Sequence, residues 1–397
     1  MDKQRHHIIQ FACIMALLAA IVLQGFTNVV KMKPLSPYTS HFVVEPQALT
    51  FKTYLDGSYQ KHLAQKARKH TGFVEFFSRC HHQVAYSCFG KIANPNVIEG
   101  KHQELFLKGN IDDVTGKLLL LKYGSIENAK AEAQKNVAAT LTLMNTLRQH
   151  GTQFLFVFCP TKPAVYPEYL PKPYQDELSD FCLEDYYVQL FKENDSPHID
   201  FHSYFKTIKD TFPYPLYTRT GSHWAASTMP FVCDSLFRKL EEISGCQLPS
   251  INYIDPNLGS RYTEQDGELE HSLDLLFPMA KPKVPRPVFA LQDTVGKSRP
   301  NLVVVGDGYF VPLEKTCFLE AFHTWNYLKY NDYVISSNPN YSWKHFKTLP
   351  DARQVLENAD FVMAVYTSNY LFDYMNGFAQ SAIELYNMPE IEKQTQP

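Results

Sequence analysis

The sequence predicts an α/β domain with a mostly parallel central sheet, covered by helices on both faces in a three-layer α/β/α arrangement. Two observations lead to this prediction: short strand-like runs that are apolar at every position, and amphipathic helices between them. Strands buried on both faces read as continuous apolar runs, whereas half-exposed strands alternate. Helices that separate such strands along the chain are typical of a parallel sheet.

Three runs fit the buried-strand description, at residues 154–158, 302–305 and 361–365. The first follows a helix that we expect to start after Ser125, whose hydroxyl can cap it, and to end before Gly151. A second helix is expected over residues 225–243, closed by Gly245. Because ligands of open parallel sheets bind beyond the carboxyl ends of the strands, the segments after residues 158, 305 and 365 are the ones to examine.

Composition places the chain among globular proteins. Hydrophobic residues make up 45% of the 397 residues and charged residues 20%, so the chain can build a large core and is not disordered as a whole. The net charge of −3 gives no electrostatic reason to expect a nucleic-acid partner.

The N-terminus predicts the compartment. Lys3 and Arg5 precede an almost unbroken apolar run over residues 8–26, which is long enough to cross a bilayer once. We expect residues 1–7 to be cytoplasmic, residues 8–30 to be a transmembrane signal anchor and the rest to be extracytoplasmic. A cleaved signal peptide is the alternative, but no small-x-small cleavage site follows the apolar run.

Behind the anchor, we expect a spacer over residues 31–70 and one domain over residues 71–397. The spacer contains three prolines and no clear periodicity. Residues 246–300 contain seven prolines and are expected to form a loop-rich insertion within the domain.

Seven cysteines lie outside the apolar run, so at least one thiol stays free. The pairs Cys80/Cys88 and Cys233/Cys246 are near enough in sequence to form disulfides in an exported domain, but sequence does not fix the pairing. Cys159 ends an apolar strand and is expected to be buried and inert.

No metal or cofactor is expected. The adjacent residues Cys80, His81 and His82 do not converge well on one ion. His198 and His202 are expected on one face of a strand, and without a third ligand we favour a surface role for them.

Three segments at strand ends or helix starts carry residues suited to chemistry. They are Pro160-Thr161-Lys162, Thr220-Gly221-Ser222-His223-Trp224 and Gly306-Asp307-Gly308-Tyr309. Each is a common turn or loop sequence when taken singly. Their order and their placement at strand ends together point to one site.

In that order, the three segments resemble the motifs of the AlgJ/AlgX-type, SGNH-hydrolase-like polysaccharide O-acetyltransferases. The likeness runs over about residues 97–386, and it implies a flavodoxin-like α/β/α domain. Residues 220–224 resemble the family's Thr-Asp-x-His-Trp motif, and residues 306–308 its Gly-Asp-Ser motif. The resemblance implies an extracytoplasmic role, a cell-surface or exopolysaccharide substrate, and a membrane-bound O-acyltransferase as partner.

The departures from the family motifs concern the catalytic residues themselves. In the family, the Ser of Gly-Asp-Ser is the nucleophile, the His of the second motif its base, and the Asp before it the group that orients the base. Here His223 is present, but Gly308 stands at the nucleophile position and Gly221 at the orienting position. A glycine has no oxygen to acylate, so the acyl-serine route is closed at Gly308.

The candidate catalytic residues are therefore His223 and Asp307, at a site degenerate at Gly221 and Gly308. Candidate substrate-binding residues are Lys162, Trp224, Gly306 and Tyr309. Lys162 could meet an anionic sugar or extend from the strand end, and Trp224 could stack on sugar or pack in the core.

Several routes to function stay open. Another hydroxyl could replace the missing serine: the candidates are Ser222, Ser227, Thr367, Ser368 and Tyr309. Ser222 is better explained as a helix cap. His223 could activate an acceptor hydroxyl directly, or Asp307 could act as base. Alternatively, the chain is a pseudoenzyme that binds glycan or scaffolds an acyltransferase complex.

Overall fold

The computed structural model describes residues 2–37, 47–69, 71–259, 263–349 and 351–387. The chain divides into two compact units, the first made of residues 1–98 and 269–280 and the second of residues 99–268 and 281–397. The strand-end segments predicted above all lie in the second unit.

The first unit is built from helices. Its helices are α1 (Asp2–Thr27), α2 (Phe51–Leu55), α3 (Ser58–Lys69) and α4 (Val74–Phe89). Within α1, the stretch Arg5–Thr27 is long and apolar enough to cross a membrane, and its side chains are mostly exposed. Signal sequences share these properties, so α1 is consistent with either an anchor or a leader. The predicted spacer contains α2 and α3.

The second unit contains a six-stranded sheet with the strand order β4-β3-β10-β7-β8-β9. All neighbouring strands are parallel except β8 and β9. The strands are β3 (Gln153–Cys159), β4 (His198–Asp200), β7 (Leu302–Gly306), β8 (Trp325–Lys329), β9 (Tyr333–Ser336) and β10 (Phe361–Thr367). The three predicted strands are β3, β7 and β10, which lie side by side in the centre of the sheet, so this prediction is confirmed.

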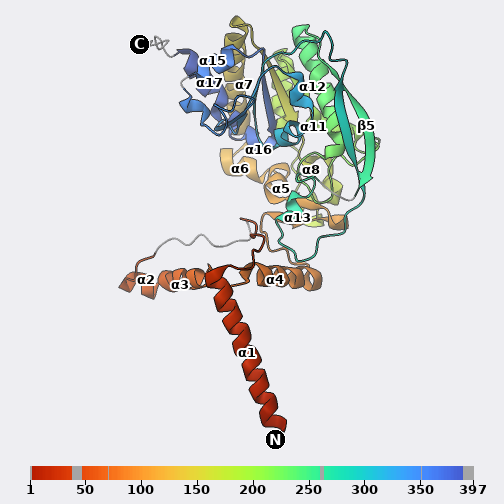
Figure 1. Cartoon of the computed structure of the whole chain (residues 1–397). Helices are drawn as coiled ribbons and strands as arrows, with labels where there is room; N and C mark the ends of the chain where they lie inside the picture. Colours follow the sequence, from red (N-terminus) through yellow and green to blue (C-terminus); the bar gives the residue numbers. More distant parts are fainter. Residues whose placement is uncertain (1, 38–46, 70, 260–262, 350, 388–397) are drawn as a thin grey trace, which may run out of the picture. The chain divides into compact units, whose positions relative to one another are not determined.

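Side chains of the central strands alternate between two separate cores. In β3, Phe156 and Phe158 enter one core, whereas Leu155 and Val157 enter the other. Helices α7 (Ile126–Gln149), α15 (Ala352–Glu357) and α17 (Phe378–Asn387) lie on one face, and α11 (Phe201–Ile208) and α12 (Met229–Ser244) lie on the other (Figure 1). Both faces are therefore covered, which explains why these strands are apolar at every position.

Shorter elements complete the second unit. They are β2 (Leu105–Leu107), α5 (Lys108–Val114), α6 (Lys117–Tyr123), α8 (Lys162–Val165), α9 (Lys172–Asp176), α10 (Leu183–Glu193), α14 (Val311–Glu314) and α16 (Ser368–Leu371). Strand β1 (Val97–Glu99) and helix α13 (Glu268–His271) lie where the chain passes between the units.

The predicted helix after Ser125 is α7, and Ser125 accepts a hydrogen bond from the backbone N–H of Asn128. The second predicted helix, α12, begins four residues later than expected, at Met229. Its predicted first turn is instead a loop and a short 3₁₀ turn, because Trp224 pairs with Tyr217 in an isolated β-bridge.

The predicted loop-rich insertion also contains regular structure. Strands β5 (Ser250–Gly259) and β6 (Val284–Gln292) pair antiparallel over their length. Prolines in both strands hid this ribbon from sequence reasoning, since proline removes a ladder donor and is typical of loops.

The cysteines are all free thiols in this structure, so neither suggested disulfide is present. Cys159 is buried, as predicted, and burial raises the pKa of its thiol well above the usual range. The prediction for His202 is wrong. It follows β4 on helix α11 rather than sharing a strand with His198, and only 2% of it is exposed.

Replacing Phe156 by Ala is expected to cost about 3–5 kcal/mol of unfolding free energy, because it leaves a cavity against Phe191 and Tyr374. The matched control is Leu121→Ala, at a side chain that is 84% exposed, which is expected to stay within about 0.5 kcal/mol. Urea denaturation of the full chain in detergent, followed by near-UV circular dichroism, measures both. Equal losses would contradict the packing of Phe156 in the core.

Candidate active site

The carboxyl ends of β3, β7 and β10 meet at one edge of the sheet because the three strands are parallel neighbours. Lys162 follows β3, and Asp307 and Gly308 follow β7. The loop that holds His223 reaches the same edge, since the ring of His223 lies beside the Gly308 backbone. The structure therefore brings the three predicted motifs together.

Lys162 is a buried structural residue of this site, and its ammonium is not exposed. Its side chain is 1% exposed, and Nζ forms an ion pair of 2.8 Å with Glu104. Nζ also donates to backbone carbonyls at 2.8–3.3 Å, those of Leu105, Thr218, Arg219 and Gly221. Burial lowers the pKa of Lys162, against the charge of Glu104. With its ammonium enclosed by these partners, Lys162 holds the His223 loop against the end of β3.

His223 forms a dyad with Glu268. Nδ1 of His223 lies 2.9 Å from Oε1 of Glu268, and the two side chains are 23% and 27% exposed. The same oxygen accepts from the backbone N–H and the hydroxyl of Ser222, both at 2.7 Å. Burial lowers the pKa of His223, but the carboxylate of Glu268 outweighs burial and raises it overall. The carboxylate thus orients the imidazole and leaves Nε2 to face the sheet edge.

The family's orienting position could not hold an acid in this chain. A Cβ at Gly221 would lie 2.6 Å from the carbonyl oxygen of Gln265 and 2.7 Å from Oγ1 of Thr218. These contacts arise because the segment before Glu268 packs on the His223 loop, where the carbonyl of Asp266 accepts from Thr218 and Thr220. The close approach that demands glycine at 221 is the same one that delivers Glu268 to His223.

Gly308 lies directly opposite the base. A Cβ built on Gly308 would lie 2.8 Å from Nε2 of His223 and 3.5 Å from the hydroxyl oxygen of Tyr330. The imidazole therefore points at the place from which a nucleophile side chain would extend, and it partly fills that place.

Asp307 supports the turn next to Gly308. Its side chain accepts from the backbone N–H groups of Tyr309 and Thr367, both at 2.9 Å, and from the Thr367 hydroxyl at 2.7 Å. Burial raises the pKa of Asp307, and the Thr367 hydrogen bonds oppose that shift. This carboxyl holds β7 and β10 together beyond their ends.

The remaining predicted binding residues are buried. Trp224 is fully buried, and its indole N–H donates to the carbonyl of Tyr309 at 3.0 Å. Tyr309 is 5% exposed and donates its hydroxyl proton to the carbonyl of Ser222 at 2.7 Å. Gly306 is a strand residue, where a Cβ would lie 2.7 Å from the carbonyl oxygen of Val365. These three residues therefore support the site from within the core and do not line its surface.

The alternative hydroxyls all have partners other than the imidazole. Ser222 donates to Glu268 and does not cap α12, so that interpretation is wrong. The other four bind elsewhere: Ser227 to the carbonyl of Pro215, Thr367 to Asp307, Ser368 to Asp113, and Tyr309 to the carbonyl of Ser222.

Sequence reasoning missed Glu268 and Tyr330. Glu268 lies 45 residues after His223, inside the segment expected to be an insertion. Tyr330 follows β8, one more strand end on the same edge, and its backbone N–H donates to the carbonyl of Gly306 at 2.8 Å. The rule that functional groups follow parallel strands could have singled out Tyr330, but no sequence signal marked Glu268.

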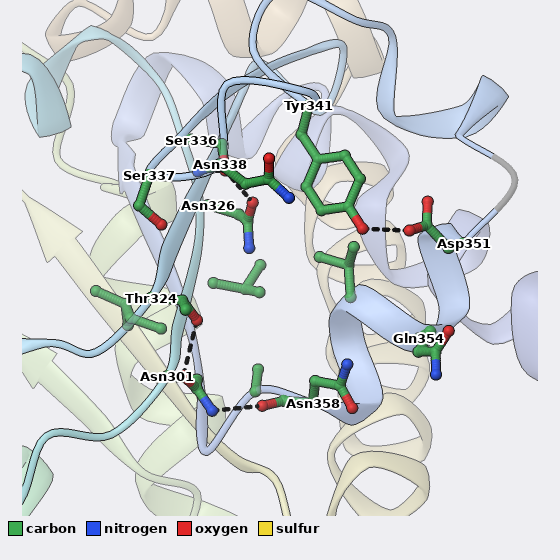
Figure 2. A pocket seen from close by; sticks show the side chains of 14 residues that line it. Asn301, Thr324, Asn326, Ser336, Ser337, Asn338, Tyr341, Asp351, Gln354 and Asn358 are labelled. Carbon is green, nitrogen blue, oxygen red and sulfur yellow. Dashed lines mark hydrogen bonds between the residues drawn. The ribbon is translucent and has the colours of Figure 1, made fainter.

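A separate polar pocket lies at the opposite edge of the sheet, where β7 and β8 begin (Figure 2). Figure 2 shows Asn301 hydrogen-bonded to Thr324 and Asn358, and Tyr341 to Asp351. Its polar groups largely satisfy one another, and it shares no residue with the His223 site.

A comparison with protein families covers two of the three sequence motifs and ends before residues 306–308. The family model of the SGNH hydrolase-like domain of acetyltransferase AlgX matches residues 115–252, which contain Lys162 and His223, and this match supports the AlgJ/AlgX-type assignment. A comparison with curated proteins finds no match.

Among solved structures, the O-acetyltransferase domain of Pseudomonas putida AlgJ is similar at 19% identity and a TM-score of 0.44, with 72% of this chain and 99% of that one covered. Pseudomonas aeruginosa AlgX is similar at 15% identity and a TM-score of 0.43, with 70% and 66% covered. Bacillus cereus PatB1 with a sulfonyl adduct is similar at 14% identity and a TM-score of 0.37, with 62% and 92% covered.

Replacing Glu268 by Gln is expected to lower the pKa of His223 below its ordinary value of 6.5, because the burial remains while the opposing carboxylate is lost. Proton NMR titration of the His223 ring measures this shift, with His223→Ala to assign the signal. The control is Glu264→Gln, which removes a carboxylate on the same segment that pairs with Lys315. An unchanged His223 pKa in the Glu268→Gln variant would contradict the dyad.

The dyad also makes stability depend on pH. Because folding raises the pKa of His223, its stabilising contribution is complete below pH 6.5 and is lost as the pH rises through the folded-state pKa. Because folding lowers the pKa of Glu268, its contribution is present above pH 4.5 and is lost as the pH falls through the folded-state pKa. Thermal melts of wild type and Glu268→Gln are therefore expected to differ most between these two pH values.

Replacing Lys162 by Met is expected to lower the free energy of unfolding by about 3–5 kcal/mol. The reason is that Glu104 and four backbone carbonyls lose their buried hydrogen-bond donor. Lys101→Met is the control, since this exposed lysine makes one carbonyl contact, to Glu168 at 3.0 Å. Chemical denaturation compares the two variants. A Lys162 variant as stable as the Lys101 variant would show that the ammonium does not hold the loop.

Proposed function

We propose that this chain, with its AlgX-type SGNH hydrolase-like domain, is a membrane-anchored extracytoplasmic protein that takes part in O-acetylation of a cell-surface or exported polysaccharide. In this proposal α1 is the anchor, and a membrane-bound O-acyltransferase supplies the acyl group. The observation that supports catalysis is the oriented base: His223 is held by Glu268, and its Nε2 faces the nucleophile position at Gly308.

The proposed chemistry is direct transfer without an acyl-serine. Nε2 of His223 takes the proton from an acceptor hydroxyl, and the acceptor oxygen then attacks the carbonyl carbon of an activated acyl donor. The bond from that carbon to the leaving group breaks, and the proton on His223 passes to the leaving group. The carboxylate of Glu268 stabilises the imidazolium that forms between these two steps.

Asp307 and Tyr330 also have roles in this proposed chemistry. Asp307 holds the turn that carries Gly308, so it acts through the backbone and not as a base. The Tyr330 hydroxyl lies within 3.5 Å of the position a Gly308 Cβ would take, where it can donate to the acceptor or to the developing oxyanion.

Gly308 itself supports a second candidate, a pseudoenzyme that docks in an acyltransferase complex. A serine-hydrolase triad that lacks a member retains only about 10³–10⁴-fold acceleration over water. Lys162 and Trp224 are buried, so in either function the glycan would be recognised by other residues.

Acetyl-ester turnover by the full chain in detergent separates the two candidates. Direct transfer predicts slow turnover of an activated acetyl ester by the wild type, lost in His223→Ala and reduced in Glu268→Gln. His323→Ala, at an exposed histidine, is the control and is expected to retain wild-type turnover. A wild type no faster than His223→Ala would overturn direct transfer.

Gly308→Ser tests whether the site still fits an acyl-enzyme. Gly308 does not have a positive φ, so a serine is compatible with its backbone, but the imidazole must move away because the new Cβ would lie 2.8 Å from Nε2. We expect at least about tenfold higher turnover than wild type, because a serine hydroxyl would meet an oriented base. Activity in this variant alone, with a silent wild type, would favour the pseudoenzyme. Gly109→Ser, at an open position, is the matched control.

A further inference from the structure

A second cluster of reactive side chains lies at the carboxyl end of β4, beside the neighbouring end of β3. His202 follows β4 on α11, and Cys182 directly precedes α10. Neither residue belongs to the motifs that form the His223 site. The cluster lies at the strand edge where open parallel sheets bind ligands.

The cluster has the geometry of a thiol, a base and an orienting acid. Sγ of Cys182 lies 3.7 Å from Nε2 of His202, and Nδ1 of His202 lies 2.6 Å from Oε2 of Glu184. His202 is 2% exposed and Glu184 is fully buried, so both are fixed by their surroundings. The acid and the thiol thus lie on opposite nitrogens of one imidazole, the arrangement in which a base can activate a nucleophile. The Nδ1–Glu184 contact is an ion pair by distance, without hydrogen-bond geometry, and the thiol shares Nε2 with the ammonium of Lys206.

The thiol lies at the start of a helix, among charged side chains of both signs. Cys182 is the N-cap residue of the 11-residue helix α10, its side chain makes no capping hydrogen bond, and Glu184 and Asp185 stand in the first turn. Lys206 places Nζ 2.5 Å from Nε2 of His202. Asp185, with Oδ1 3.4 Å from the same nitrogen, is the opposing charge.

Titration within the cluster is coupled. Burial lowers the pKa of His202, but the charge of Glu184 raises it overall, well above the usual range. Burial raises the pKa of Glu184 to about 7, against the attraction of His202. Asp113 on α5 lines the same pocket, and burial raises its pKa to about 6.

A small, mostly apolar pocket opens beside the thiol. Its volume is about 170 Å³, close to that of an engineered cavity of about 150 Å³ that holds benzene, so it fits a group of a few heavy atoms. Cys182, His202 and Lys206 line it together with apolar side chains, among them Val114, Leu119, Ala164, Phe181 and Phe372.

A metal site is the competing interpretation of the same residues. Cys182, Asp185 and His202 offer ligand atoms within 4.8 Å of one another. However, the ammonium of Lys206 lies 2.5 Å from the histidine nitrogen that would bind the ion, and Asp185 is exposed. A cation in that place opposes the binding of a metal ion.

We propose that Cys182, His202 and Glu184 form a second acyl-transfer site, in which Cys182 is the nucleophile for a short-chain acyl ester or thioester. The thiolate attacks the carbonyl carbon, and the bond to the leaving group breaks as His202 protonates the departing oxygen or sulfur. Water, deprotonated by His202, then attacks the thioester. The carbon–sulfur bond breaks, and the carboxylic acid leaves while Cys182 returns to its thiolate form. This site is independent of the function proposed for His223.

The first test compares alkylation of individual cysteines by iodoacetamide in the full chain, followed by peptide mass spectrometry from pH 5 to 9. Cys246 is the matched thiol, because it is also half-buried but, among the described residues, its sulfur has no histidine partner. We expect Cys182 to react at least about tenfold faster than Cys246 at pH 6, because Nε2 of His202 lies 3.7 Å from its sulfur and can serve as its base. Equal rates at pH 6 would overturn the proposal.

Variants then identify the activating groups. His202→Gln is expected to abolish the fast reaction at pH 6. Because His202 is buried and its variant can misfold, the exposed Lys206→Gln is the second variant, expected to slow alkylation at pH 6 without unfolding the chain. Lys192→Gln on α10, with a side chain 62% exposed, is the control and is expected to react like wild type. A Lys206→Gln rate equal to that of Lys192→Gln would contradict the electrostatic activation.

The second test looks for the covalent intermediate. Brief treatment with para-nitrophenyl acetate is expected to leave a hydroxylamine-sensitive acetyl group on Cys182 in wild type and in His223→Ala, but not in Cys182→Ser. Persistence in His223→Ala would separate this site from the one above. One equivalent of zinc that copurifies with wild type and is lost in Cys182→Ser would show a metal site and overturn the nucleophile.

Discussion

The buried ammonium of Lys162 is the contact on which the active-site geometry depends. It emerges from the end of β3 and binds the carbonyls of Leu105, Thr218, Arg219 and Gly221, with Glu104 as its counter-ion. An ammonium leaves water only at a cost of several kcal/mol, so it is tolerated only where close acceptors surround it. That requirement brings the loop before His223 to the sheet edge and fixes it there. Lys162 therefore serves the site by positioning, although its charge first suggested a contact with an anionic sugar.

The dyad of His223 and Glu268 depends on one close backbone contact, at Gly221. Backbone packs so tightly on Gly221 that no side chain fits, and the segment responsible carries Glu268 to Nδ1 of His223. The acid beside the imidazole thus lies 45 residues after the histidine, and not two residues before it as the resemblance to the family motif implied. No comparable substitution serves Gly308, because the nearby hydroxyls of Ser222 and Tyr309 are committed to other acceptors. The site therefore contains a histidine paired with an acid, and a glycine at the position where the family motif has serine.

Both side-chain clusters proposed as catalytic lie at the same edge of the sheet, and the fold explains why. Parallel strands end together, so every loop after β3, β4, β7, β8 and β10 opens on that edge. The helix that begins beyond such a loop adds a positive N-terminus, which α10 presents to Cys182. One imidazole faces an empty nucleophile position and the other faces a thiol, and in each a buried or half-buried glutamate binds Nδ1.

The sequence by itself determined the central strands, the start of α7 at Ser125 and the meeting of the three motifs, because these depend on local periodicity and on the parallel arrangement of strands. It also determined that residue 308 cannot be acylated, since glycine has no side-chain oxygen. Only the tertiary structure decided that Glu268 orients His223, that Lys162 and Trp224 are buried, and that His202 lies inside the protein. These three facts depend on contacts between residues far apart in the chain. They follow from the distances between individual atoms in the packed structure. Neither spacing nor hydrophobic pattern carries that information.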